Sequence, residues 1–213
     1  MFMKKRAISQ DAKAEIKQLM LRAALDEFYE KGFAAARMDD IAKRCDYSKG
    51  TLYLYFTSKE ALFYGLIETI AKPNQTRLIK MMTSAPSAQS AIKAVTEFMP
   101  YIIENSQLPR LIKILIGDSG AFPEIVQLYK EQVIEQALDA FTAVFQRSNA
   151  SGETHITEPE LFCRLVVSPV IFSAVWKAVF AKKGEMGFDL QAFFKLHQKI
   201  ILNSLKLNIE IES

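Results

Sequence analysis

The sequence has little of what extracellular, metal-binding and membrane proteins depend on. Of its 213 residues only two are cysteine and two are histidine. Cys45 and Cys163 lie far apart, without the spacing of a metal site, and we expect both to be reduced, small apolar residues. No uninterrupted apolar run reaches the roughly 18–20 residues of a membrane span, and the basic start leads into polar residues rather than a signal core. We therefore expect a cytoplasmic protein without metal or cofactor.

Glycine and proline are also scarce, at eight and seven residues, and alternating strand-like runs are rare. Half of the residues are hydrophobic and 11% are aromatic, enough to bury a sizeable core. This composition predicts an all-α protein of about nine helices. Helical periodicity places them near residues 11–31, 38–45, 49–56, from 59 to at least 72, 88–105, 108–116, 123–147, 159–183 and 189–207.

Charge is distributed unevenly along the chain. The net charge is +3, and residues 1–60 hold 12 Lys and Arg against 9 Asp and Glu, whereas residues 61–213 hold 15 of each. The whole positive excess therefore lies in the first quarter, which weakly indicates an anionic partner there.

The segment from Gly32 to Leu62 carries the strongest signal. Two short helices joined by a tight turn suit a helix-turn-helix, whose second helix fits the major groove of DNA. Ala42 is small where the helices approach, and Asp46 stands at the turn, where aspartate tolerates a left-handed conformation. Ser48 is placed to cap the second helix. The shared inner face is predicted to consist of Ile41, Cys45, Tyr47, Leu52 and Phe56.

The second helix of this pair divides into two faces. Leu52 and Phe56, at i and i+4, point inward, which leaves a cation, a hydroxyl and two phenols on or near the outer side. Such groups donate to phosphates and contact base edges. The alternative is that the tyrosines are core aromatics. For Tyr53 DNA contact is favoured, because the buried face is already supplied, whereas for Tyr55 the two readings are balanced.

The run Ser48-Lys49-Gly50-Thr51-Leu52-Tyr53-x-Tyr55-Phe56-x-x-Lys59-Glu60-x-Leu62 resembles the signature of the TetR (tetracycline-repressor) family, as do Gly32-Phe33 and Ile41-Ala42. The resemblance covers about residues 12–62. It implies a helix-turn-helix DNA-binding domain over residues 1–58 and a helical effector-binding and dimerisation domain over residues 59–213. It also implies a homodimer that represses from palindromic double-stranded operator DNA and is released by a small-molecule effector.

Carried over by matching position, the resemblance places Thr51, Tyr53 and Tyr55 against DNA, with Lys59 holding a phosphate. Where the family often has two threonines, this chain has Ala36-Arg37. Arg37 cannot act as a hydroxyl cap, at a cost of about 1 kcal/mol, although acidic residues in the first turn offset part of that. Arg37 either reaches a phosphate or is an ordinary surface residue. The predicted DNA-binding residues are Arg37, Ser48, Lys49, Gly50, Thr51, Tyr53, Tyr55 and Lys59.

The next helix is expected to begin with a capping box, in which Thr57 is followed three residues later by Glu60, and Pro73 should end or kink it. The C-terminal aromatics are individually more typical of core than of a pocket, but together they leave room for an apolar cavity. Few charges interrupt these runs, which favours a hydrophobic effector over a phosphorylated one. The predicted pocket residues are Phe98, Ile102, Leu115, Phe122, Tyr129, Phe172 and Trp176.

The last two predicted helices carry more apolar residues than one core face needs, which suits a symmetric four-helix contact between two copies. The predicted interface residues are Val167, Ile171, Ala174, Val175, Ala178, Phe193, Leu196, Ile200 and Ile201.

Two other functions stay open on the sequence alone. One is a helical small-molecule carrier or enzyme without DNA binding, although no catalytic cluster accompanies His155 or His197. The other is a DNA-binding protein without an effector, whose apolar C-terminal runs only pack and dimerise.

Overall fold

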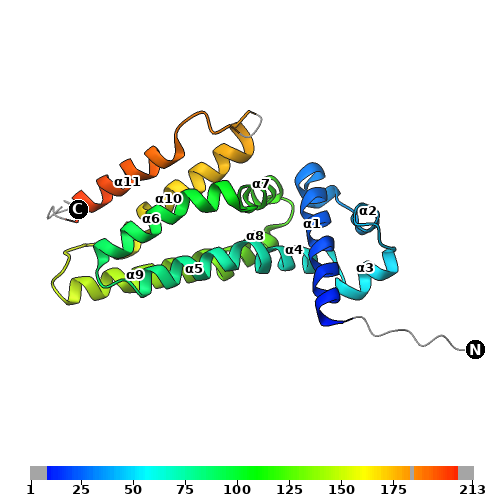
Figure 1. The fold of residues 1–213 in the computed structure, drawn as a ribbon, viewed down its shortest axis with the longest axis horizontal. Coiled ribbons are helices and arrows are strands. Elements are labelled where there is room, and N and C mark those ends of the chain that lie inside the picture. The colour runs from blue at the N-terminus through cyan, green and yellow to red at the C-terminus, as the bar shows by residue number, and fades with distance from the viewer. Residues whose placement is uncertain (1–8, 183–184, 206–213) are drawn as a thin grey trace, which may run out of the picture.

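The computed structural model of the chain describes residues 9–182 and 185–205. Within these ranges the regular structure is helical, apart from an isolated bridge between Lys182 and Glu185, so the predicted all-α class is confirmed. Figure 1 shows a small helical head at one end of the molecule and a longer body at the other. The predicted helix ends at residues 183 and 207 lie outside the described residues.

The head consists of α1 (Gln10–Ala35), α2 (Met38–Arg44) and α3 (Lys49–Tyr55). The body consists of the remaining elements, in which η denotes a π-helical turn: α4 (Lys59–Leu66), η1 (Ile67–Ala71), α5 (Lys72–Thr83), α6 (Ala88–Asn105), α7 (Leu108–Asp118), α8 (Pro123–Tyr129), η2 (Lys130–Glu135), α9 (Gln136–Ala150), α10 (Pro159–Val175), η3 (Trp176–Phe180) and α11 (Leu190–Ser204). The predicted helices 38–45 and 49–56 are thus confirmed to within one residue.

Helix α1 is long and breaks near its end at Gly32, whose φ of 81° and ψ of 158° are not helical. Ser9 caps its start, because its hydroxyl accepts from the Ala12 N–H at 3.2 Å. Beyond the break, the Ala36 N–H donates to the Gly32 carbonyl and closes one further turn, and Phe33 is fully buried in it. The break therefore turns the chain toward α2 without leaving the core.

Helix α4 begins differently from the prediction and runs further. The cap is Ser58, whose hydroxyl accepts from the Ala61 N–H, and not Thr57. Pro73 neither ends nor sharply breaks the rod, because η1 lies directly before it and α5 continues to Thr83. Proline lacks an N–H and crowds the carbonyl four residues back. The wider π turn, in which the Lys72 N–H donates to the Ile67 carbonyl, accommodates it.

The body core lies where α5, α6, α9 and α10 meet, with α11 packed along α6 and α7 packed against α1. Cys163 is fully buried there beside the Thr142 hydroxyl, and Cys45 is half-buried in the head; both are free thiols. The segment Pro159–Phe180 is long and apolar enough to span a membrane by composition, but α10 packs as a core helix against α6, α7 and α9. Much of its remaining apolar surface is exposed.

We predict that Gly32→Ala destabilises the protein by about 1–3 kcal/mol, because the conformation of this residue is one that only glycine adopts without strain. A Cβ at this position would also lie 3.5 Å from the Asp118 carboxylate oxygens. Urea unfolding measures the loss. Gly120→Ala is the control, since a Cβ at Gly120 meets nothing within 4 Å, and equal losses in the two variants would contradict the prediction.

Candidate nucleic-acid interface

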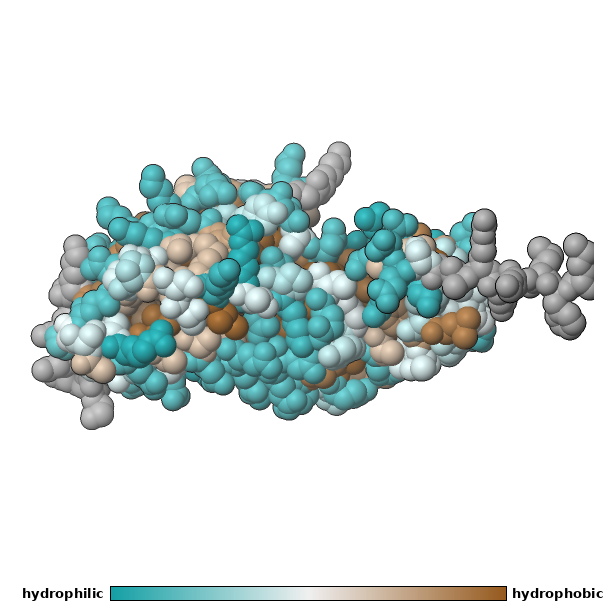
Figure 2. Space-filling view, turned by 60° about the horizontal axis from the view of Figure 1, so that its bottom comes forward, coloured by the Kyte–Doolittle hydropathy of each residue, from teal (hydrophilic) through white to brown (hydrophobic). Residues whose placement is uncertain are grey.

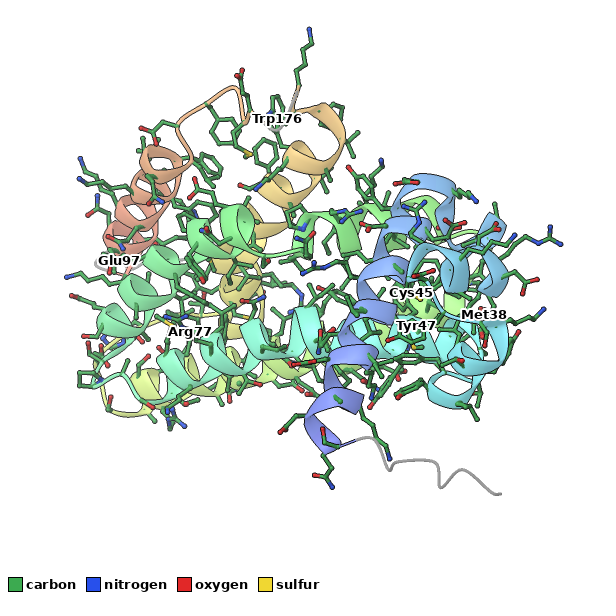
Figure 3. The ribbon with its side chains drawn as sticks, turned by 45° about the vertical axis from the view of Figure 1, so that its right-hand side comes forward. Met38, Cys45, Tyr47, Arg77, Glu97 and Trp176 are labelled. Atoms are coloured by element: carbon green, nitrogen blue, oxygen red, sulfur yellow. The ribbon has the colours of Figure 1, made fainter. Side chains whose placement is uncertain are left out.

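Helices α2 and α3 form a helix-turn-helix around Asp46. Among the described residues Asp46 is the one non-glycine with a positive φ, 59°, as predicted from its place at the turn. The Asp46 N–H donates to the Lys43 carbonyl and the Tyr47 N–H to the Ala42 carbonyl at 2.9 Å. Cys45 and Tyr47 lie half-buried beside α1, where Figure 3 labels them. The turn therefore fixes α3 across the end of α2.

The start of α3 is held by Ser48, which accepts from the Thr51 N–H at 3.1 Å, so the predicted cap is confirmed. The Thr51 hydroxyl lies 2.8 Å from the same oxygen and is half-buried, so it is directed to the cap as well as to the outer side. Gly50 is exposed, and a Cβ there would meet only the Ser48 hydroxyl at 3.9 Å. Space alone therefore does not require glycine at this position.

The outer face of α3 presents a cation, a phenol and an aliphatic side chain. Lys49 forms an exposed ion pair with Asp39 at 2.7 Å, which raises the pKa of the lysine, and its ammonium lies 5.9 Å from the Tyr53 ring centroid. Tyr53 is 42% exposed and Leu54 is 85% exposed, whereas Leu52 is fully buried. Tyr55 is half-buried and packs against the core. On the face seen in Figure 2 the head is mostly hydrophilic around small apolar patches.

Leu54 was not among the predicted DNA-binding residues, because only polar and charged groups were expected to contact DNA. Its spacing did carry a signal: with Leu52 and Phe56 turned inward at i and i+4, the position between them faces away from the core. A single exposed leucine is ordinary on a protein surface, so Leu54 matters here because it lies beside Tyr53 on the outer side of α3.

Arg37 occupies the N-cap position of α2 without forming a side-chain cap, and it is exposed. Charged pairs at the other end of α2 fasten this helix to α1. Arg44 contacts Glu30 at 2.6 Å and the buried Glu27 at 3.0 Å. The Arg44 guanidinium lowers the pKa of Glu30, which favours the charged form of this carboxylate. These ion pairs therefore join α2 to α1.

Lys59 has an intramolecular role that the sequence did not predict. Its ammonium donates to the carbonyls of Phe33 at 2.8 Å and Ala34 at 3.1 Å, and it lies 4.9 Å from the Phe33 ring centroid. From the other side, the carboxylate of Asp118 accepts from the N–H groups of the same two residues, at 2.7 and 3.0 Å. We call this arrangement the 33–34 clamp. It joins the head to α4 and α7.

Other contacts extend this junction along α7. Arg110 forms an ion pair with Asp26 of α1 at 2.7 Å, and Arg110 and Lys113 both lie over the Tyr29 ring. The Phe33 ring packs edge-on against Phe122, with centroids 5.0 Å apart. Phe122 therefore packs at the head–body junction, and the ligand contact expected for it from sequence stays a prediction.

The body contains an apolar cavity of about 150 Å³ between α5, α6, α9 and α10. Of the predicted pocket residues, Ile102 and Tyr129 line it. Phe98 instead stacks on Tyr101 beneath the Arg77 guanidinium, and Leu115 is buried in α7. Phe172 and Trp176 belong to an aromatic cluster with Phe188 and Phe193. Figure 3 labels Trp176, which begins η3 directly after α10. Aromatic side chains fill a packed core as readily as they line a cavity, so their number in the sequence could not show where the cavity lies.

The predicted interface residues separate into four groups. Leu196 and Ile200 are exposed on α11, at 57% and 58%. Val167 and Ile171 line the cavity instead, although Ile171 is also 44% exposed. Ala174 and Ile201 are buried, and the remaining three, Val175, Ala178 and Phe193, are half-buried. The structure adds exposed apolar residues that were not predicted, namely Leu161, Leu165, Phe172, Val179 and Phe180.

Family comparisons match both parts of the chain. The model of the family described as bacterial regulatory proteins, tetR family, matches residues 20–65. The model described as the C-terminal domain of AefR-like transcriptional repressors matches residues 90–187. Among the described residues, no group of three or more His, Cys, Asp or Glu is arranged to hold a metal ion.

Curated relatives match part of the chain. The HTH-type transcriptional regulator YuxN of Bacillus subtilis is 34% identical over 92 residues, which cover 43% of this chain and 32% of YuxN. The chain spans less than two thirds of the length of YuxN and of two other curated regulators that it matches, YdgC and YhgD of the same organism.

Solved structures extend the likeness to the whole fold. A SmeT–triclosan complex has a TM-score of 0.74 at 18% identity, covering 93% of this chain and 96% of that one. NalD of Pseudomonas aeruginosa, described as the secondary repressor of the MexAB-OprM multidrug efflux pump, has a TM-score of 0.69 at 18% identity, with 92% and 98% covered.

We predict that Asp118→Asn lowers the free energy of unfolding by about 1–3 kcal/mol, because an amide oxygen is a weaker acceptor than a carboxylate and its NH₂ group would face an N–H. Denaturant unfolding gives the difference. Asp139→Asn on the exposed surface of α9 is the matched control. The clamp would be energetically unimportant if the two variants proved equally stable.

Proposed function

The chain belongs to the TetR family of transcriptional regulators, and on that premise we propose that it is a cytoplasmic, ligand-responsive repressor. In this proposal residues 1–58 bind palindromic double-stranded operator DNA and residues 59–213 dimerise and bind a small hydrophobic effector that releases the DNA. The observation that carries the proposal is the outer face of α3. Lys49, Tyr53 and Leu54 are exposed together on a helix whose opposite face is fully buried.

Each group on that face suits a different part of a duplex. Tyr53 can donate its hydroxyl to a phosphate or base edge, and Leu54 can contact a thymine methyl group. Lys49 is held by Asp39, but an exposed ion pair contributes at most about 1 kcal/mol, so a phosphate can replace the carboxylate. Arg37 and the half-buried Thr51 and Tyr55 flank this face, with Ser48 and Gly50 at its start. Lys59 stabilises the head through the clamp, and phosphate contact by it stays a prediction.

Dimerisation is supported by the apolar surface of the last two helices. Leu161 and Leu165 of α10 and Ile200 of α11 border an apolar groove of about 350 Å³. Contiguous exposed apolar surface of this kind is rare on monomers and marks interfaces. A second copy related by two-fold symmetry would bury both helices of each protomer in one four-helix contact. Two recognition helices would then reach half-sites roughly 34–36 Å apart.

Effector control requires that the ligand bind the free and DNA-bound arrangements with different affinity. A coupling of about 1–3 kcal/mol would weaken operator binding by roughly 5- to 150-fold. The apolar cavity supports a ligand-binding role for the body, and the 33–34 clamp gives the head and body a shared contact. Repression relieved by ligand is therefore the form of regulation that we propose.

We predict that Leu54→Ala and Tyr53→Ala each weaken binding to a selected operator by roughly 5- to 100-fold, because each removes a base-edge or phosphate contact. The operator is first selected from random DNA with the purified protein, and fluorescence anisotropy then gives the Kd. Lys49→Ala should reduce the dependence of log K on log salt concentration by about one unit. Ile116→Ala, an exposed aliphatic residue on α7, is the control. Unchanged operator affinity in both α3 variants would refute the role proposed for the outer face of α3, and failure to select any operator would refute the DNA-binding proposal.

We further predict that the chain is a dimer in sedimentation equilibrium and that Leu165→Glu combined with Ile200→Glu makes it monomeric, because the interface would bury unpaired carboxylates. Ile116→Glu should leave the dimer intact. Retention of the dimer in the double variant would place the interface elsewhere, and a monomeric parent protein would refute this part of the proposal.

A further inference from the structure

The cavity in the body is lined without a single charged side chain among the described residues. Its walls are mostly aliphatic, with Met99 and Ile102 on α6, Phe141 on α9 and Val170 on α10. Removing a charged ligand from water into such a space costs several kcal/mol unless an opposite charge receives it. An ionised ligand therefore has no partner here, and the lining selects for neutral molecules.

Three polar side chains line the same cavity, and the amide nitrogens of two of them already donate within the protein. The Gln75 side-chain nitrogen donates to the carbonyl of Val133 at 2.8 Å, within the π turn η2, and also to that of Gln132 at 3.1 Å. The Asn74 nitrogen uses one of its two N–H groups on the Ile70 carbonyl at 2.8 Å. The groups that remain for a ligand are therefore the two amide oxygens, which are acceptors, and one N–H of Asn74.

The third polar group is the hydroxyl of Tyr129. The Tyr129 side chain is only 6% exposed, and burial alone raises its pKa, so the phenol stays protonated at neutral pH. Within the part of the chain that the structure describes, no hydrogen bond contributes to this shift. A buried hydroxyl ordinarily finds a partner. Tyr129 is one of the residues that line the cavity, so a ligand oxygen there can supply that partner.

We propose that the cavity binds a small, uncharged, mainly apolar molecule that carries one hydroxyl group, with a phenol as the representative compound. The ligand hydroxyl accepts from the Tyr129 hydroxyl and donates to the side-chain oxygen of Gln75 or Asn74, while its ring contacts the aliphatic walls. The available volume of about 150 Å³ corresponds to one six-membered ring, because an apolar cavity of about that size takes up benzene. The inference rests on the proposed function for its regulatory meaning.

Calorimetric titration of the full-length protein without DNA tests the chemistry directly. The probes are phenol, cyclohexanol, benzene and benzoate at pH 7. We expect saturable one-to-one binding of phenol and cyclohexanol, weaker binding of benzene because it lacks the hydroxyl, and no binding of benzoate because no cation faces it. Benzoate binding as tightly as phenol, or no saturable binding of either hydroxyl compound, would overturn the proposal.

Two variants locate the site. Tyr129→Phe should raise the Kd for phenol by roughly 3- to 10-fold, the net worth of one neutral hydrogen bond, and leave the Kd for benzene unchanged. Ala137→Leu, which adds volume at the cavity wall, should abolish binding of both. Tyr101→Phe, on the exposed side of α6, is the matched control and should bind phenol like the parent protein. An identical phenol Kd in the Tyr129 and Tyr101 variants would refute the assigned hydrogen bond.

Operator binding measured in parallel separates this inference from the proposed function. Phenol that binds in the cavity without changing the operator Kd would support the site and refute the proposed release by effector. Operator binding that persists in a protein with no phenol-binding heat would overturn the site and leave the DNA-binding proposal standing.

Discussion

The single turn formed by residues 33–35 is the constraint on which the arrangement of head and body depends. Gly32 breaks α1 with a backbone conformation that side chains oppose, and the groups freed by the break are satisfied by opposite charges: Asp118 receives the N–H groups and Lys59 donates to the carbonyls. Charge-assisted hydrogen bonds of this kind are each worth roughly 1.5–3 kcal/mol. The clamp therefore fixes the angle at which the helix-turn-helix leaves the body, with the Phe33 ring packed beneath it against Phe63 and Phe122.

The local features of the head could be read from the sequence because each depends on near neighbours. The cap at Ser48, the left-handed Asp46 and the inward pair Leu52 and Phe56 all follow from residues within a few positions. The clamp could not be read in this way, since Asp118 lies 85 residues from Phe33 and nothing local marks either as a partner. The clamp role of Lys59 went unpredicted for the same reason, since Phe33 lies 26 residues before it.

The sequence predicted the helices of the body but not which of their faces are buried, exposed or turned toward the cavity. Helix α10 carries few polar residues, chiefly Glu160, Arg164 and Ser168, and so narrow a polar side leaves its inward direction poorly specified by sequence. Val167 and Ile171 accordingly line the cavity although they were assigned to the interface, while Leu161 and Leu165 are exposed although they were not. The π turns also change which residues face inward, because each rotates the residues that follow by about a quarter of a turn relative to a regular helix. Amino-acid composition does not show where such turns occur.

The cavity and the clamp share their supporting elements, and this limits how a ligand can act on the head. Leu108, at the start of α7, and Ala71, at the end of η1, both line the cavity, whereas Asp118 and Lys59 lie at the opposite ends of α7 and of the α4–η1 segment. A ligand changes the head only to the extent that it binds two positions of these elements with different free energy. A molecule that merely fills a preformed space would stabilise the fold and leave the clamp as it is. Control of the head therefore requires a ligand that displaces Leu108 or Ala71, and a ligand larger than one ring would have to move part of the cavity wall in this way.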